Sequence, residues 1–296
     1  MTPEEFQFLS GLLRERSGLV LTRDKTYLIE NRVMPVIRRR RFQGMKELMA
    51  GVRAGEAALV QEVVDAMMTL DTSFFRDWKP WQQFRSVTLP NTLEARQKKK
   101  SFRILSCGTS TGQEAYSIAM TLKQMGDELG AWDHSIVAVD LVESALSRAR
   151  NGIFSQFEVQ SGLPVRQLLA NFKKVGDGQW KISDTLRAGV EFKRWNLVDE
   201  LYALGAFDIV FCRNVIKSFD QAMQKQVLGN LARLLSDDGV LYLGLGETTV
   251  GISSSFRPID PAIGLFGIHR PDRPVARNLA AESIQAPPQS GANAAV

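Results

Sequence analysis

The segment from Phe102 to Ala119 constrains the fold of this chain more than any other. It begins with a short apolar run, passes through small residues between Gly108 and Gly112, and continues with apolar residues at helical spacing. This order predicts a strand, a tight loop and a helix. Glycines let a ligand approach the backbone and a helix start offers unpaired N–H groups, so the loop suits a nucleotide-type cofactor. An ordinary turn between a strand and a helix also favours glycine, so both interpretations stay open on this motif alone.

Strands and helices alternate along the rest of this region. Such alternation predicts an α/β fold with a doubly wound, mostly parallel sheet, whose ligands bind beyond the carboxyl ends of the strands. The predicted elements are strands at 102–107, 135–140, 207–212 and 239–243, helices at 114–125 and 142–150, and a helix that places Met223, Val227, Leu231 and Leu234 inward.

Asp140 stands at the end of the second predicted strand, 28 residues beyond Gly112. In doubly wound folds an acidic residue at such a position accepts hydrogen bonds from ribose hydroxyls. A carboxylate that caps the helix beginning near Val142 is the alternative. Together with the two glycines, Asp140 favours a site for a nucleotide or for S-adenosylmethionine.

Residues 1–70 predict a small helical domain. Thr2 to Glu5 form a capping box with proline at the first helical position, and residues 59–67 carry an apolar helical face. A further helix is predicted at 25–41, where Pro35 should kink or split it. The run Arg38 to Arg41 fits either a solvated helix end or a docking surface for an acidic partner.

The remaining segments complete the predicted domain organisation. Residues 71–100 are predicted to form a linker with an aromatic anchor, and residues 101–270 the main domain. Within it, 180–182 and 190–192 alternate apolar and polar residues, which predicts an antiparallel pair in an inserted β-subdomain at about 155–195. Its edge could accept a partner peptide as an added strand, or it could simply cover the sheet. The tail, 271–296, is rich in proline and alanine and is predicted to be disordered.

Composition limits the classes of function. A net charge of +5 and a pI near 9.3 suit an acidic partner but are too mild to require nucleic acid. No apolar run is long enough for a membrane span and no signal peptide is evident, so we expect a cytoplasmic protein without membrane insertion. Cys107 and Cys212 lack metal-ligand spacing and are expected to be small buried residues, so no metal site is predicted.

Four segments in order resemble the CheR-type chemotaxis receptor methyltransferases, a family that uses S-adenosylmethionine to methylate receptor glutamates. The likeness runs from about residue 4 to about residue 270. It implies a helical amino-terminal domain that helps to hold the receptor, an S-adenosylmethionine methyltransferase domain, and a small β-subdomain that in some members grips a receptor tail. The matching segments are Thr72 to Asp77, Ser110 to Ser117, Phe207 to Val215 and Gly239 to Gly244.

The resemblance also implies a set of site residues. Arg76 would be catalytic, because its planar guanidinium could orient the acceptor carboxylate. The implied partners are the cytoplasmic helical regions of methyl-accepting chemotaxis receptors, met by the basic region at Arg38 to Arg41, and the protein is expected to be a monomer. The implied contacts with S-adenosylmethionine are Thr72, Arg76, Glu114, Asp140, Asn196, Leu197, Arg213 and Asn214.

The chain departs from the family pattern at several positions. Leu70 stands where the family usually has asparagine, Ser218 where it has a tyrosine, Leu245-Gly246 where it has His-Ser, and Thr109 where it has cysteine. A glutamate acceptor is already ionised at neutral pH, so losing the tyrosine should weaken methyl transfer rather than abolish it. The alternative is a catalytically decayed module that still binds cofactor or receptor. The positive charge alone suggests a nucleic-acid methyltransferase, but the chain has no Asn-Pro-Pro-Tyr type base-binding motif.

Overall fold

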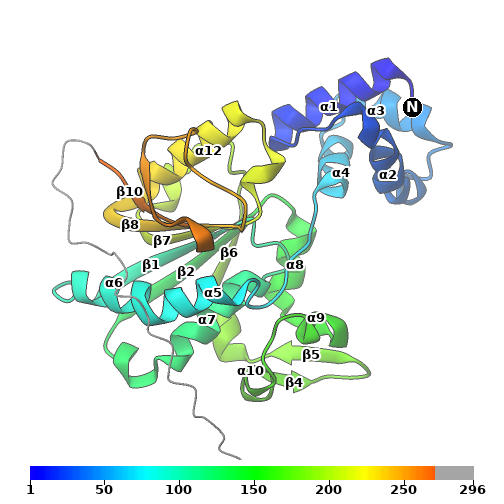
Figure 1. Ribbon diagram of the computed structural model, residues 1–296. Coiled ribbons are helices and arrows are strands. Elements are labelled where there is room, and N and C mark those ends of the chain that lie inside the picture. Colours follow the sequence, from blue (N-terminus) through cyan, green and yellow to red (C-terminus); the bar gives the residue numbers. More distant parts are fainter. Residues whose placement is uncertain (271–296) are drawn as a thin grey trace, which may run out of the picture.

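The computed structural model describes residues 1–270, and Figure 1 shows three groups of elements in it. Helices from the amino end gather apart from a seven-stranded sheet flanked by helices, and a small three-stranded sheet lies on another side of the large one. The tail predicted to be disordered, 271–296, lies outside the described residues.

The amino-terminal helices pack around a core of their own. One apolar face of each helix is buried there, because no single amphipathic helix can hide that face alone. These helices are α1 (Pro3–Ser17), α2 (Thr26–Arg40), α3 (Met45–Arg53) and α4 (Ala57–Met67).

Helix α1 begins as the sequence predicts. The Thr2 side chain accepts from the Glu5 N–H at 3.2 Å, and the Glu5 carboxylate accepts from the Thr2 N–H at 2.8 Å. Of the two predicted effects of Pro35, a kink or a split, the split does not occur, since α2 runs through Pro35 without a break. Pro35 and Asn31, whose carbonyl loses its helical donor, are both exposed, so water can satisfy that carbonyl.

A linker with two short helices follows, α5 (Trp78–Gln83) and α6 (Leu89–Ala95), which a single wide turn over Phe84–Thr88 joins. The aromatic residues before α5 anchor it. Phe74 is fully buried and packs edge-on against Phe154 and Phe172 of the small sheet, with ring centroids 5.1 and 5.6 Å apart.

The large sheet confirms the predicted fold class. Its strand order is β6-β2-β1-β7-β8-β10-β9, with parallel pairing from β6 to β8 and antiparallel pairing at β10 and β9. The strands are β1 (Ser101–Cys107), β2 (Asp133–Asp140), β6 (Val190–Arg194), β7 (Phe207–Cys212), β8 (Leu235–Leu243), β9 (Phe256–Asp260) and β10 (Leu265–Ile268).

Helices cover both faces of this sheet. Along β1, Phe102 and Ile104 face the core that contains α7 (Gln113–Gln124) and α8 (Glu143–Asn151). Leu105 and Cys107 face the core that contains α12 (Gln221–Leu234), and Cys212 is buried there too, as predicted. The chain runs outward from β1 through β2 to β6 and then returns to β7 on the other side of β1, so the strand order reverses between β1 and β7.

The small sheet corrects one predicted pairing. Strand β5 (Gln179–Ile182) pairs with β3 (Ile153–Ser155) and β4 (Phe172–Lys174), not with residues 190–192. Those residues belong to β6, which pairs in parallel with β2. Helix α11 (Asp184–Ala188) separates β5 from β6, and burial of Phe192 against Tyr116 favours the large sheet. Helices α9 (Gln156–Gln160) and α10 (Val165–Asn171) complete this part.

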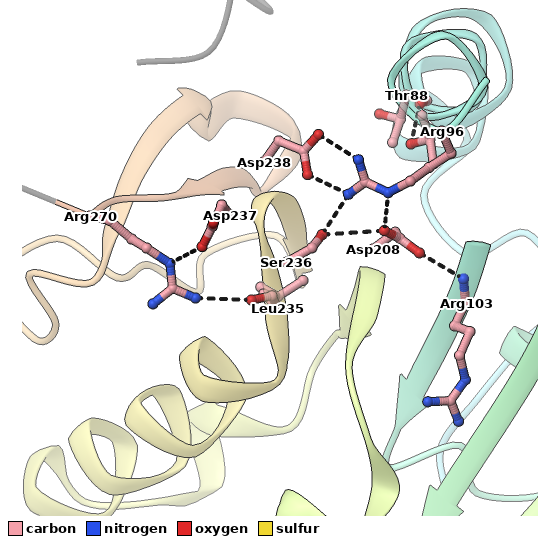
Figure 2. Close-up of polar contacts among 10 residues, drawn as sticks. Thr88, Arg96, Arg103, Asp208, Leu235, Ser236, Asp237, Asp238 and Arg270 are labelled. Atoms are coloured by element: carbon pink, nitrogen blue, oxygen red, sulfur yellow. Dashed lines mark hydrogen bonds and ion pairs between the residues drawn. The ribbon is translucent and has the colours of Figure 1, made fainter. Parts of the chain in front are cut away.

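Arg96, just after α6, ties the linker to the amino-terminal ends of the sheet strands (Figure 2). Its Nε donates to Asp208 of β7 at 2.7 Å, and its Nη1 donates to Asp238 of β8 at 2.8 Å. Asp208 also accepts from the Arg103 N–H of β1 at 2.8 Å. One guanidinium therefore fixes the linker to neighbouring strands, at the edge opposite the carboxyl ends.

Candidate functional site

A cleft opens at the carboxyl ends of β1 and β7. This is where the strand order reverses, the place at which doubly wound sheets bind their ligands. The linker closes one side, the glycine loop after β1 another, and the segment after β7 a third. The lining residues are Asp71, Thr72, Ser73, Arg76, Trp81, Gly108, Glu114, Arg213 and Asn214.

The glycine loop needs its glycines. Gly108 has φ +64° and Gly112 has φ +95°, a region that other residues rarely adopt. A Cβ at Gly108 would lie 2.6 Å from the Val215 side chain, and one at Gly112 would lie 2.9 Å from Ala149. The absence of a Cβ therefore lets the loop pack closely against the segment after β7 at Gly108 and against α8 at Gly112. The order of strand, tight loop and helix is the one that the sequence predicts.

Glu114 reaches into the cleft from the first turn of α7. Its carboxylate accepts from the Ser106 hydroxyl at 2.9 Å. Burial raises the pKa of Glu114 to about 7, because desolvation outweighs the attraction of Arg213. Near neutral pH this group can therefore carry either charge state, which a surface glutamate cannot.

Arg213 is held rigidly on the opposite side. Its side chain is 1% exposed, Nη2 donates to the Asp77 carboxylate at 2.7 Å, and Nη1 donates to the Arg76 carbonyl at 2.9 Å. Its Nε is buried and has no hydrogen-bond partner among residues 1–270. A buried unpaired donor on a fixed cation is costly, so this atom is suited to an anionic group within the cleft.

Arg76 is the more exposed cation of the cleft. Among residues 1–270, its guanidinium donates hydrogen bonds to Asp71 alone, from Nη2 to the carboxylate at 3.1 Å and from Nη1 to the carbonyl at 3.3 Å. The Arg76 side chain is 32% exposed. The sequence placed Arg76 at the site but did not indicate Asp71.

Asp140 organises the loop rather than lining this cleft. One carboxylate oxygen accepts from the Ser110 N–H at 2.7 Å and the other from the Val142 N–H at 2.9 Å. Burial raises the pKa of Asp140. The contact with Val142 lies just before α8, whose start has no side-chain cap, so Asp140 does not cap that helix. The contact with Ser110 steadies the loop at a residue with φ +52°. The ribose contact stays a prediction.

The other two residues implied for the cofactor also lie away from the cleft lining. The Asn196 amide donates to the Arg16 carbonyl at 2.8 Å and so joins the large sheet to helix α1. Leu197 is buried in the core beside α12. The structure thus gathers five of the implied residues around the cleft, Thr72, Arg76, Glu114, Arg213 and Asn214, and leaves Asp140, Asn196 and Leu197 outside its lining.

Glu247 shapes the cleft without lining it, a role the sequence did not reveal. Its carboxylate accepts from the N–H groups of Asn214 and Gly244 at 2.7 Å each and from that of Lys217 at 3.0 Å. Glu247 is 7% exposed. It therefore fixes the segment after β7 to the end of β8, and with it Asn214, which has φ +62°.

Ser218, in place of the family's tyrosine, is turned toward its own backbone. Its hydroxyl donates to the Val215 carbonyl at 2.7 Å, and its carbonyl accepts from the Val20 N–H at 3.2 Å. Arg14 pairs with Asp220 at 2.7 Å close by. The helical amino-terminal part therefore packs directly against the segment that follows Asn214.

Two further observations concern the described chain. Within residues 1–270, no group of three His, Cys, Asp or Glu side chains is arranged to hold a metal ion. Over the same residues, no helix has the length and apolar character needed to cross a membrane.

Comparison with known proteins identifies the family. The model "CheR methyltransferase, all-alpha domain" matches residues 4–68, and "CheR methyltransferase, SAM binding domain" matches residues 70–263. The chain is 32% identical over 262 residues to the chemotaxis protein methyltransferase of Vibrio parahaemolyticus, covering 88% of this chain and 94% of that protein. It is 30% identical over 265 residues to chemotaxis protein methyltransferase 1 of Pseudomonas aeruginosa, covering 88% and 96%.

Among solved structures, the chain is similar to the magnesium protoporphyrin IX methyltransferase of Synechocystis with bound SAH, at 17% identity and a TM-score of 0.30, covering 55% of this chain and 54% of that one. The family models together span the helical part and the strands from β1 to β9, which include those that carry the cleft. The chain belongs to the CheR methyltransferase family, and its cofactor is S-adenosylmethionine.

Proposed function

We propose that this chain methylates glutamate side chains in the cytoplasmic helical region of methyl-accepting chemotaxis receptors, acting as a monomer in the cytoplasm. The names of its relatives place them in chemotaxis, and the chain covers nearly their whole length. The observation that carries the proposal is one cleft that presents two guanidiniums, Arg76 and Arg213, beside the buried carboxyl of Glu114. Such a cleft can hold a cofactor with an amino acid end together with an acidic acceptor.

The residues fit S-adenosylmethionine. Its methionyl end carries an ammonium and a carboxylate, which call for an anion and a cation in the protein. Glu114 can supply the anion, and the buried Nε of Arg213, which lacks a partner among residues 1–270, can supply the donor. We infer that these two residues, with Thr72 and Asn214, hold that end of the cofactor, and that Asp140 serves the ribose.

S-adenosylmethionine supplies, when bound, an electrophilic methyl group on a sulfonium. The chain's own task is to position the acceptor, because a glutamate with an ordinary pKa near ~4.3 is ionised at neutral pH and needs no general base. Arg76 would orient that carboxylate through its planar guanidinium. Holding the reacting groups in one geometry can supply a large share of the rate acceleration.

The loss of the tyrosine at position 218 fits slow transfer better than none. The Ser218 hydroxyl is used by the Val215 carbonyl, so it adds no donor to the cleft. A missing orienting contact costs roughly one or two powers of ten in rate. The cations and the carboxyl of the cleft remain in place.

The test is incubation with methyl-labelled S-adenosylmethionine and a receptor cytoplasmic fragment, followed by measurement of base-labile methyl esters. We expect esters from the wild type and a loss of at least about 100-fold for Arg76→Ala. Arg85→Ala is the matched control, since Arg85 is exposed on the same linker and donates a hydrogen bond to Gln124, outside the cleft lining. Cofactor binding without any ester above the Arg76→Ala background would refute the proposal.

A further inference from the structure

We propose that Asp71 competes with the acceptor for Arg76, its carboxylate standing where the acceptor's carboxylate binds. The inference rests on the proposed function and deepens it, because it assigns the acceptor's binding position and a residue that limits its affinity. It also gives the chemical class of the acceptor group from the chain itself, since Arg76 already meets a carboxylate within the cleft.

The geometry of the contact is that of a carboxylate bound by arginine. Nη2 of Arg76 lies 3.1 Å from the Asp71 carboxylate, and Nη1 lies 3.3 Å from the Asp71 carbonyl. Both residues line the cleft that also contains Glu114. A glutamate side chain offers the same carboxylate on a longer stem, so it can make the contact that Asp71 now makes.

The two cations of the cleft differ in a way that separates their roles. Arg213 is 1% exposed and is fixed by Asp77 and by the Arg76 carbonyl, so its remaining donor faces a buried position. The Arg76 side chain is 32% exposed, and within the described residues 1–270 its guanidinium donates only to Asp71, five positions earlier in the chain. A deep fixed cation suits a ligand that the cleft encloses during methyl transfer, and a shallower one suits a side chain that a receptor presents from solution.

The contact between Asp71 and Arg76 is weak enough to be displaced. The Asp71 side chain is 71% exposed, and ion pairs in water contribute little because solvent screens them. Exposed pairs are typically worth about 0.2–1 kcal/mol, which corresponds to a change of up to about five-fold in affinity. Asp71 should therefore reduce acceptor affinity by about two- to five-fold without preventing binding.

A positioning role for Asp71 predicts the opposite outcome. If the pair with Asp71 were needed to hold Arg76 in its productive orientation, removing the carboxylate would weaken acceptor binding. The sign of the change in affinity therefore distinguishes competition from positioning, and Asp71→Asn is the variant of choice because asparagine keeps the size of the side chain.

The first experiment needs no methyl transfer. Propionate, the smallest analogue of a glutamate side chain, is titrated into the full chain saturated with S-adenosylhomocysteine, and the Nε–H signal of Arg76 is followed by NMR and assigned with Arg76→Lys. We expect propionate to bind Asp71→Asn about two- to five-fold more tightly than the wild type. Asp71→Glu, which restores a carboxylate, should return toward the wild-type affinity.

Asp133→Asn is the matched control. It removes the same charge from an exposed residue at the amino end of β2, the sheet edge opposite the cleft, and should leave the propionate affinity unchanged. Equal or weaker propionate binding by Asp71→Asn would overturn the inference, as would the absence of propionate binding at Arg76 in both proteins.

The second experiment measures methyl transfer to a receptor fragment. Asp71→Asn should lower KM for the receptor by about two- to five-fold and change kcat by less than about two-fold, because the competing carboxylate affects binding alone. A raised KM would refute the inference. If no protein forms methyl esters while the propionate affinity still rises in Asp71→Asn, the proposed function fails and the binding position on Arg76 stands.

Discussion

Replacing Glu114 with glutamine should change how the stability of the protein depends on pH. Glutamine keeps the size of the side chain and can still accept from the Ser106 hydroxyl, but it cannot ionise. In the wild type, the pKa of Glu114 rises from an ordinary 4.5 to about 7 because the cleft removes its carboxyl from water. The folded protein therefore binds more protons than the unfolded chain between these two values.

The magnitude follows from the shift. Each pKa unit corresponds to about 1.4 kcal/mol, so ionised Glu114 costs the folded state about 3 kcal/mol at high pH. Because the folded-state pKa is raised, this cost is absent below pH 4.5 and grows as the pH rises through 7. Integrated over the titration, the wild type should lose roughly 2–3 kcal/mol between pH 5 and pH 8 through this group alone.

The assay is urea denaturation of wild type and Glu114→Gln at pH 5, 6, 7 and 8, with equal slopes as the condition for comparison. The stability of Glu114→Gln relative to wild type should increase by roughly 2–3 kcal/mol across this range, most of it between pH 5 and pH 7. Glu128→Gln, the same change at an exposed glutamate, measures the effect of removing a surface charge. A relative stability of Glu114→Gln that stays constant within about 0.5 kcal/mol would refute the reasoning that burial dominates at Glu114.

Three further predictions concern other parts of the molecule. Arg96→Met should lower the free energy of unfolding by about 2–4 kcal/mol relative to Arg85→Met, because it leaves the partly buried Asp208 and Asp238 without their cation. Arg96 lowers the pKa of Asp238, so this difference in the free energy of unfolding should shrink as the pH falls through that lowered pKa. Urea denaturation at neutral and acid pH measures it, and a difference of the same size at both would contradict the prediction. Gly162→Ala should destabilise the protein by at least about 2 kcal/mol more than Gly55→Ala in the same assay. Both glycines have positive φ, but a Cβ at Gly162 would lie 2.1 Å from the Phe74 carbonyl oxygen, whereas one at Gly55 meets nothing within 4 Å. Equal losses of stability would contradict the close approach at Gly162. Glu247→Gln should weaken S-adenosylhomocysteine binding about 10- to 100-fold in calorimetry, because an amide cannot accept from all three N–H groups that the Glu247 carboxylate binds. An affinity equal to that of Glu128→Gln would show that the segment after β7 keeps its shape without the carboxylate.

Much of the sheet could be predicted because its strands are local in sequence. Phe102 and Ile104 face one core and Leu105 and Cys107 the other, so a continuous apolar run in β1 already indicates a strand covered on both faces. Strands β9 and β10 were not predicted, because the first contains Pro258 and the second has only four residues. Helix α3 was missed as well, since its nine residues start without a side-chain cap.

The pairing of β5 could not be predicted, because the alternation of apolar and polar residues indicates a strand but not the strand with which it pairs. Residues 180–182 and 190–192 both alternate apolar and polar side chains and stand close in the chain, which favours a hairpin. Helix α11 separates the two strands, and the packing of Phe192 against Tyr116 favours the large sheet for β6. The contact between Phe192 and Tyr116 joins residues far apart in the sequence, so it could not be read from the local pattern.

Some features of the cleft could likewise be predicted from the sequence and others could not. Gly108 follows β1 and Arg213 follows β7, and the carboxyl ends of neighbouring parallel strands share one edge, so their meeting could be predicted. The roles of Glu247 and Asp71 could not. Glu247 acts through backbone N–H groups about 30 positions away, and the contact of Asp71 depends on how the linker turns before α5.

That turn links the two cations of the cleft. Phe75 and Asp77 both have positive φ, at 46° and 56°, and each such residue costs on the order of 1 kcal/mol unless its surroundings hold it. The Ser117 hydroxyl accepts from the Phe75 N–H at 3.0 Å, and Arg213 holds both Asp77 and the Arg76 carbonyl. Arg213 is thus part of what keeps Arg76 in place. Truncating Arg213 would disturb the cofactor end and the acceptor end together, so only changes at the Arg76 side chain or at Asp71 can separate the two.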